Sequence, residues 1–144
     1  MTVIETYTVG GTTRESVFDG RLDWTSACPL SHLIPGRGVA VLLRGGQQAA
    51  LFLLDDGTLR AVGNIDPYGR AAVMSRGIVG DRGGEPTVAS PLLKQVFSLE
   101  DGRCLDDPSV RLPVYEVRVW AGVVQIHNVA LAEGRYGSAT GEDS

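Results

Sequence analysis

Short apolar runs separated by glycine-containing turns dominate this chain of 144 residues. Runs of five or six residues end at Arg-Gly-Gly, Asp-Asp-Gly, Asp-Gly or Ala-Gly, all of which permit tight turns. Runs this short between such turns are typical of β-strands joined by hairpins, and no stretch has the apolar periodicity of a long helix. The sequence therefore predicts an all-β domain of about eight strands.

The strands can be placed by number. Five of them are expected at 39–43, 49–54, 58–62, 115–120 and 123–127, and two more in the segments PTVAS and KQVFSL. The alternation in YEVRVW points Tyr115 to one face of its strand and Arg118 to the other. One helical turn is indicated in TSACPLSHLI, where Pro35 ends it.

The ends of the chain differ in composition from its middle. Residues 1–20 are rich in Thr, Gly and Glu without sustained periodicity, so we expect a flexible N-terminal arm. Residues 21–129 carry the apolar runs and form the expected domain, and 130–144 are expected to be a flexible tail.

Charge and hydropathy exclude several classes of partner. The net charge is −4 and no cluster of Lys and Arg occurs, which argues against binding to nucleic acid or to an anionic membrane. No apolar run approaches the roughly 18 to 20 residues of a membrane helix, and the N-terminus lacks the features of a secretory signal. We therefore expect a cytoplasmic protein with Cys28 and Cys104 reduced.

Residues that carry metal or nucleophilic chemistry are sparse. The chain has two cysteines and two histidines, Cys28, His32, Cys104 and His127. Structural zinc sites use two close pairs of ligands, but here only the first two residues are close in sequence, so a buried cysteine and a surface histidine are favoured over zinc. No motif around a serine or cysteine indicates a catalytic triad.

Glycines and paired carboxylates also have a structural explanation. The segment Gly77–Pro86 lacks the phosphate-binding pattern and is interpreted as a loop whose glycines take positive φ. Asp55-Asp56 and Asp106-Asp107 lie at expected turns, and neighbouring residues on extended chain point apart, so neither pair is expected to act as acid and base.

Two segments resemble, in order and spacing, the ligand loops of Rieske-type domains. The first is AVGNIDPYGR. When Asn64 and Pro67 are aligned with the loop pattern n-x-C-p-H-x-G, Asp66 takes the Cys position and Tyr68 the His position.

The second segment, SPLLKQVFSLEDG, resembles the pattern C-P-x-H-G-x-x-F. Alignment by Pro91 and Phe97 puts Ser90 at the Cys position, Leu93 at the His position and Lys94 at the Gly position. A Rieske [2Fe–2S] centre needs two thiolates and two imidazoles. Leu93 has no donor atom, and the oxygens of the other three residues suit such a cluster poorly, so we expect a Rieske-like all-β fold without a metal.

Longer segments resemble one branch of this fold. The segments SRGIVGD, SPLLKQVFSLEDGRCLDDP and LPVYEVRV make residues 22–128 similar to the small subunit of assimilatory NAD(P)H-dependent nitrite reductase. The resemblance implies a non-catalytic subunit, with no catalytic or cofactor-binding residue, in a cytoplasmic enzyme that reduces nitrite to ammonium. Its large subunit would be the partner and would carry FAD, sirohaem and an iron–sulfur cluster.

The former ligand loops are the expected contact surface, because exposed loops on a rigid scaffold commonly carry function. The candidate interface residues are Asp66, Pro67, Tyr68, Arg70, Leu92, Leu93 and Lys94. An equally weighted interpretation is that Tyr68 and Leu93 fill the space of a cluster. Two other functions stay open at this point, a Rieske-type electron-transfer ferredoxin and a free-standing protein-binding β domain.

Overall fold

The computed structural model describes residues 3–9, 12–18 and 23–135. Within these residues the chain forms twelve strands and two 3₁₀ turns, and none of its helical turns is long and apolar enough to cross a membrane. The strands are β1 (Val3–Val9), β2 (Thr12–Phe18), β3 (Trp24–Pro29), β4 (Gly38–Leu42), β5 (Gln48–Leu53), β6 (Leu59–Gly63), β7 (Ile78–Arg82), β8 (Glu85–Ala89), β9 (Val96–Ser98), β10 (Val114–Tyr115), β11 (Val117–Trp120) and β12 (Val123–His127). The 3₁₀ turns are η2 (Leu30–His32) and η3 (Met74–Arg76).

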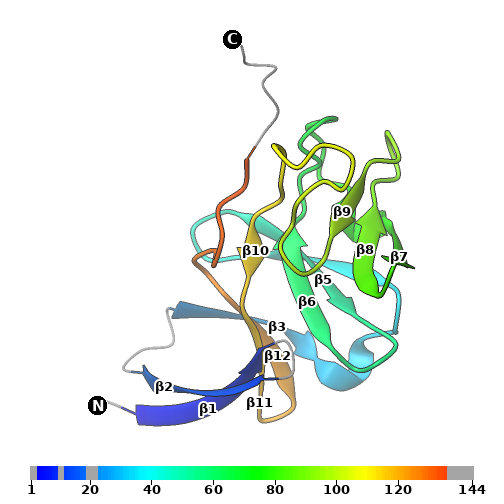
Figure 1. The fold of residues 1–144 in the computed structure, drawn as a ribbon. Helices are drawn as coiled ribbons and strands as arrows, with labels where there is room; N and C mark the ends of the chain where they lie inside the picture. Colours follow the sequence, from blue (N-terminus) through cyan, green and yellow to red (C-terminus); the bar gives the residue numbers. More distant parts are fainter. Residues whose placement is uncertain (1–2, 10–11, 19–22, 136–144) are drawn as a thin grey trace.

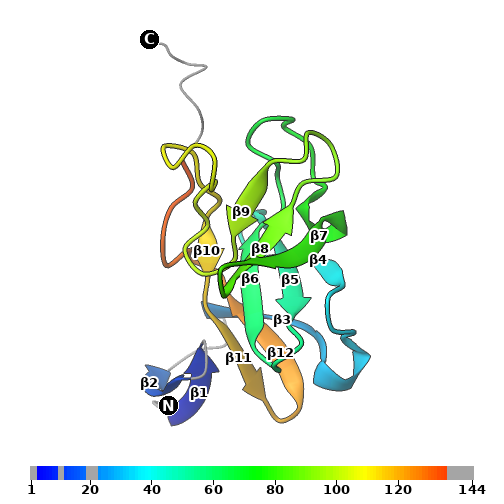
Figure 2. The same ribbon diagram turned by 45° about the vertical axis from the view of Figure 1, so that its right-hand side comes forward.

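The strands pair in antiparallel fashion throughout, which confirms the expected all-β architecture (Figure 1). The central sheet has the order β10-β6-β5-β4, and the sheets β11-β12-β3 and β7-β8-β9 pack around it. The hairpin β1-β2 forms a fourth, two-stranded sheet at the end of the molecule opposite the loops that follow β6 and β8 (Figures 1 and 2).

The expected strands are present, with additions, but the helical turn expected in TSACPLSHLI is confined to η2, because residues 25–29 pair with β12 as part of β3. The Ala-Gly link between β11 and β12 has positive φ at both residues, as a two-residue hairpin requires. The glycine-rich segment Gly77–Pro86 contains β7 and the start of β8, joined by a turn with positive φ at Gly83 and Gly84. Strand β7 was not expected, because its sequence IVGDR does not alternate cleanly and is partly polar.

The two ends of the chain are more structured than expected. Strands β1 and β2 occupy most of the segment 1–20, for which a flexible arm was predicted. Residues 131–135 run antiparallel to residues 111–114, with backbone hydrogen bonds from Leu131 to Val114 and from Arg135 to Arg111. The rest of the expected C-terminal tail, 136–144, lies outside the described residues.

Arg118 of YEVRVW is buried, although a charged side chain on a strand ordinarily lies on a solvent face; on the same face Glu116 is half-buried and Trp120 is exposed. The guanidinium carbon of Arg118 lies 4.1 Å from the ring centroid of Trp24 and 5.8 Å from that of Trp120, and its Nε donates to Gln125 Oε1 at 2.7 Å. Burial lowers the pKa of this guanidinium to about 10. Strand β1 lies against β11 and both indoles lie near the guanidinium, so the side chain of Arg118 packs against protein.

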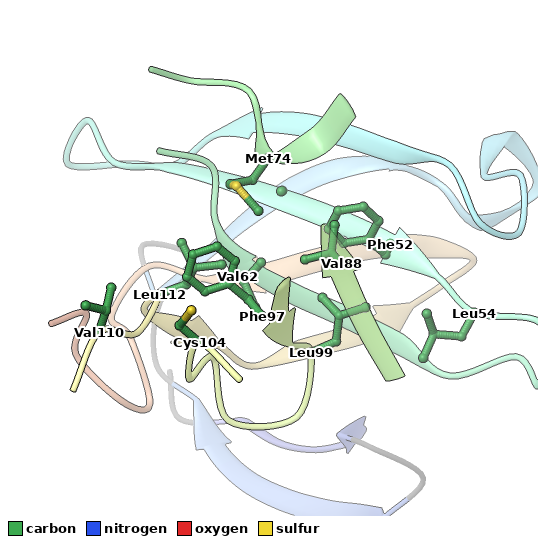
Figure 3. Packing of buried hydrophobic residues seen from close by; sticks show 11 residues of the cluster. Phe52, Leu54, Val62, Met74, Val88, Phe97, Leu99, Cys104, Val110 and Leu112 are labelled. Carbon is green, nitrogen blue, oxygen red and sulfur yellow. The ribbon is translucent and has the colours of Figure 1, made fainter. Parts of the chain in front are cut away.

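Strand β5 is buried on both faces and joins two apolar cores. Ala50 and Phe52 face the first core, between the central sheet and β7-β8-β9, whereas Ala49 and Leu51 face the second core, toward β11 and β12. The first core is shown in Figure 3 and also contains Leu54, Val62, Met74, Val88, Phe97, Leu99, Cys104, Val110 and Leu112. Because successive side chains of a strand point to opposite faces, a single apolar run can supply both cores.

Gly102, in the expected Asp-Gly turn, is fixed by close backbone packing. Its φ is +80°, and a Cβ atom at this position would collide with the carbonyl oxygen of Leu112. The Leu112 N–H donates to the Gly102 carbonyl at 2.8 Å, so the turn after β9 is held directly against the chain that leads into β10.

We predict that Gly102→Ala lowers the free energy of unfolding by about 2 to 5 kcal/mol, since it adds a steric collision to an unfavourable backbone conformation. The matched control is Gly84→Ala. Gly84 also has positive φ (+91°), but no atom lies within 4 Å of the place that a Cβ atom would take there. Its expected loss is about 1 to 2 kcal/mol. Urea unfolding followed by tryptophan fluorescence measures both, and equal losses would contradict the packing argument.

Candidate functional site

Two loops of six residues form the end of the molecule away from the β1-β2 hairpin (Figures 1 and 2). The first loop, residues 66–71, follows β6, and the second, residues 90–95, follows β8. Together they are called the tip. They contain all the positions at which the sequence places former ligands and candidate interface residues.

The two loops have the same backbone hydrogen-bond pattern. In the first, Arg70 N–H donates to the Asp66 carbonyl and Asp66 N–H to the Ala71 carbonyl, both at 2.8 Å. In the second, Lys94 N–H donates to the Ser90 carbonyl at 3.1 Å and Ser90 N–H to the Gln95 carbonyl at 2.8 Å. In both loops a proline follows the first residue. The loops are therefore two copies of one turn, with residues 66 and 90 equivalent.

The equivalent residues are hydrogen-bonded to each other. Ser90 Oγ donates to Asp66 Oδ2 at 2.5 Å, and the two residues are 1% and 0% exposed. Each side chain also closes its own loop, since Asp66 Oδ1 accepts from Tyr68 N–H at 2.8 Å and Ser90 Oγ accepts from Leu92 N–H at 3.2 Å. Both carboxylate oxygens of Asp66 are thus satisfied, and this pair of residues joins the two loops.

The symmetry of the loops ends at their fourth residues, Gly69 and Leu93. A Cβ atom on Gly69 would lie 2.8 Å from Leu92 Cδ1, so the side chain of Leu92 rests on the first loop where no side chain stands in its way. Leu93 has no such place and is 55% exposed, compared with 47% for Leu92.

The ring of Tyr68 and the side chain of Cys104 lie on the side of the tip that faces the first core. The ring of Tyr68 packs against the first core, 6.3 Å from the ring of Phe97, and its hydroxyl is 3.5 Å from Cys104 Sγ. Burial and the hydrogen bond to Cys104 raise the pKa of the phenol above its ordinary value. In sequence Cys104 lies outside both loops, but in the fold it contacts Tyr68 of the first loop, and its Sγ is 4.0 Å from Gln95 Oε1 of the second. Because these residues are far apart in the chain, no pattern in the sequence indicates this contact.

The candidate interface residues divide by exposure. Arg70, Leu92, Leu93 and Lys94 are exposed, Tyr68 is half-buried, and Asp66 and Pro67 are buried. Tyr68 takes the space below the tip that the alternative interpretation assigned to it, whereas Leu93 points out of that space.

The remaining candidates from the sequence are dispersed over the described residues. Cys28 packs against the second core and Cys104 lies in the first, so the two thiols are in different parts of the domain. His32 is exposed at the end of η2, and the ring of His127 meets Trp24 edge-on at 4.9 Å. Among the residues that the structure describes, no three side chains of His, Cys, Asp or Glu are grouped to hold a metal ion.

The paired carboxylates have turn partners. Asp56 Oδ1 accepts from Thr58 N–H at 2.9 Å, and hydrogen bonding to the Thr58 side chain and backbone lowers the pKa of the Asp56 carboxyl. Asp107 Oδ1 accepts from Ser109 Oγ at 2.6 Å, and all of these groups are exposed or nearly so. Both pairs thus lie in turns, as the sequence predicts.

A family profile matches this chain over most of the residues that the structure describes. The profile of the Rieske-like [2Fe-2S] domain matches residues 23–127. The chain belongs to this family. The nitrite reductase (NADH) small subunit of Salmonella typhimurium is 42% identical to this Rieske-like chain over 104 residues, which are 72% of the chain and 95% of that protein.

Two further relatives extend the comparison. The crystal structure of a nitrite reductase small subunit from Mycobacterium tuberculosis, described as NADH-dependent, has 63% identity and a TM-score of 0.72 over 75% of this chain and 96% of its own. The nitrite reductase [NAD(P)H] large subunit of Klebsiella oxytoca is 39% identical over 108 residues, which are 75% of this chain but 11% of that protein. Within the Rieske-like family, the chain is thus grouped with nitrite reductase small subunits.

Residues that the alignment with Rieske loops puts at the ligand positions make other contacts at the tip. The four residues at these positions offer a carboxylate, a phenol, a hydroxyl and an alkyl group, whereas a Rieske cluster takes two thiolates and two imidazoles. The carboxylate of Asp66 and the hydroxyl of Ser90 are already bonded to each other, and the ring of Tyr68 points down to Cys104. The donor set and its geometry both favour a closed polar contact between the loops.

We predict that Ser90→Ala lowers the free energy of unfolding by about 2 to 4 kcal/mol, because a buried carboxylate loses a donor and Leu92 N–H loses its acceptor. Ser109→Ala is the matched control, since it removes a Ser–Asp hydrogen bond of the same kind on an exposed loop. Its expected effect is about 0.5 kcal/mol or less. Urea unfolding measures both variants. A loss of similar size in the two would show that burial of the Asp66–Ser90 pair adds nothing.

Proposed function

We propose that this chain is the non-catalytic small subunit of a cytoplasmic NAD(P)H-dependent nitrite reductase and supports the large subunit that reduces nitrite to ammonium. The observation that carries the proposal is the 42% identity to a nitrite reductase small subunit over 95% of that protein. A tip whose former ligand positions are used for packing and hydrogen bonding agrees with a subunit that does no redox chemistry itself.

The large subunit is the proposed partner. In Klebsiella oxytoca, a segment 39% identical to this chain is part of the large-subunit polypeptide and makes up 11% of it. Two units that are joined in one polypeptide in one organism commonly act together when they are separate in another. The similarity therefore supports a physical complex between this chain and a large subunit.

In the proposed complex, electron transfer takes place in the large subunit, with FAD, sirohaem and an iron–sulfur cluster as its cofactors. The candidate contact surface on this chain is the tip. Its exposed residues are Arg70, Leu92, Leu93 and Lys94, and the buried or half-buried Asp66, Pro67 and Tyr68 would act by holding those residues in place. Exposed loops on a rigid scaffold are suited to such a role.

A reconstitution experiment separates this proposal from an electron-transfer ferredoxin. The purified chain is expected to be colourless after anaerobic reconstitution with iron and sulfide, because no thiolate–imidazole set converges at the tip. Visible absorption and bound iron are measured, with an authentic Rieske ferredoxin treated in parallel. A visible spectrum with stoichiometric iron would favour the ferredoxin and overturn the proposal of a subunit without a cluster.

Coexpression separates the proposal from a free-standing binding domain. The large subunit of the same organism is expressed with and without this chain, and its yield, cofactor content and nitrite turnover are compared. We expect the two chains to copurify, and turnover for each large subunit to fall when this chain is omitted. An unchanged large subunit with no copurification would leave the fold as it is and remove the proposed function.

A further inference from the structure

Two cations occupy equivalent and unfavourable backbone positions at the tip. Arg70 has φ +59° and Lys94 has φ +65°, and each is the fifth residue of its six-residue loop. In the part of the chain that the structure describes, one other residue besides glycine has positive φ, Ala121 in the β11–β12 hairpin. The left-handed conformation therefore occurs at the same place in both loops, and both times with a basic residue.

The turn geometry alone would favour glycine at these two positions. The backbone bond that closes each loop there needs only an N–H, which donates to the carbonyl of Asp66 or Ser90 and which a glycine would also provide. Left-handed backbone is unfavourable for residues with a Cβ atom, and glycine adopts it readily. Strained residues of this kind concentrate at sites of function. The presence of Arg70 and Lys94 is thus a conformational cost to the loops that hold them.

The charge of the tip differs in sign from that of the whole chain. The net charge of the protein is −4, but the two loops contain two basic residues and one acidic residue. The acidic residue, Asp66, is fully buried and hydrogen-bonded on both oxygens, whereas Arg70 and Lys94 are exposed. The exposed charge of the two loops is therefore positive.

The exposed apolar residues of the tip, Leu92 and Leu93, directly precede Lys94, and Leu92 rests on Gly69 next to Arg70. An apolar centre with charge at its edge is the usual anatomy of a protein interface, in which the apolar part gives affinity and the rim charges give orientation and rate. The partner that fits this arrangement has an apolar pocket with carboxylates around its rim.

We propose that the tip docks into an acidic-rimmed apolar pocket of the nitrite reductase large subunit, with Leu92 and Leu93 as the inserted residues and Arg70 and Lys94 facing the rim carboxylates. The inference rests on the proposed function for the identity of the partner. It adds the chemistry of the contact and assigns a role to the two strained cations.

Charge reversal tests the contact. Affinity for the purified holo large subunit is measured by surface plasmon resonance for the wild type, for Arg70→Glu/Lys94→Glu and for the control Arg37→Glu. Arg37 is exposed and lies far from the tip. The N–H of the preceding residue, Gly36, donates to the carbonyl of Leu53, which is the last residue of β5 and pairs with the first residue of β6, whereas the first loop of the tip follows the last residue of β6. We expect the tip variant to lose about tenfold or more in affinity at low salt, wild-type binding to weaken as salt rises, and the control to stay within about twofold.

Glycine substitution tests the strain. Lys94→Gly is expected to unfold at the same temperature as the wild type or a few degrees higher, and at the same time to bind the large subunit more weakly. A residue retained for folding alone would give the opposite result in the thermal scan. A lower unfolding temperature would therefore overturn the assignment of the Lys94 side chain to binding.

The outcomes distinguish the inference from the proposed function. If the wild type binds and the charge-reversed tip variant binds with the same affinity, the large subunit stays the partner and the tip is overturned as the contact. Wild type that does not bind at any salt concentration would overturn both. Equal weakening by Arg37→Glu would show a non-specific effect of net charge and also overturn the tip assignment.

Discussion

A buried carboxylate must have its oxygens satisfied by hydrogen bonds, and at the tip of this domain that requirement fixes two loops at once. Asp66 is fully buried, with one oxygen bonded to Tyr68 N–H and the other to Ser90 Oγ. The Ser90 hydroxyl donates its one hydrogen to Asp66 and accepts from Leu92 N–H with a lone pair. Since the two residues begin equivalent turns, the positions of both loops follow from a single contact.

This contact does for the loops mechanically what shared ligation does in a metal centre, which is to hold two separate turns together. A polar bond between the loops leaves the space beneath them to be filled, and here Tyr68 fills it, packed on Phe97 with its hydroxyl toward Cys104. The apolar surroundings that exclude water from this space also strengthen the bond above it. The polar contact between Asp66 and Ser90 and the packing of the Tyr68 ring therefore depend on each other. Neither contains the thiolate and imidazole donors of a Rieske centre.

Much of the central architecture follows from local sequence, because period-two alternation and Asp-Gly turns report directly on strands and hairpins. These signals located β4, β5, β6, β11 and β12. They failed for β7, where glycine and charged residues interrupt the pattern. They also gave no sign that Arg118 is buried, because its burial depends on Trp24 and β1 and therefore on tertiary packing.

The tip shows the same division between local and tertiary information. The resemblance to Rieske loops identified Asp66, Tyr68, Ser90 and Leu93 as the positions to examine, but no sequence pattern indicated that the first and third are bonded to each other. Nor did it indicate that Cys104, 36 residues from Tyr68, lies under that ring. Both contacts join segments that are distant along the chain and that meet only when the sheet β7-β8-β9 packs on the central sheet. Strand periodicity carries no information about that packing.

The rigidity of the tip bears on what its exposed residues can do. Each loop is closed by two backbone hydrogen bonds and by one that its first side chain accepts from a backbone N–H, so Arg70, Leu92 and Lys94 are presented on a fixed backbone. Association with a partner then orders few main-chain torsions, which keeps the entropic cost of binding low. A strained left-handed residue persists only where the surrounding hydrogen bonds over-determine the backbone, and the two matching turns provide that. In a Rieske centre two paired loops with a fixed backbone hold the ligands of a cluster. The same fixed backbone is suited to holding two cations and two leucines in a constant arrangement for a second protein.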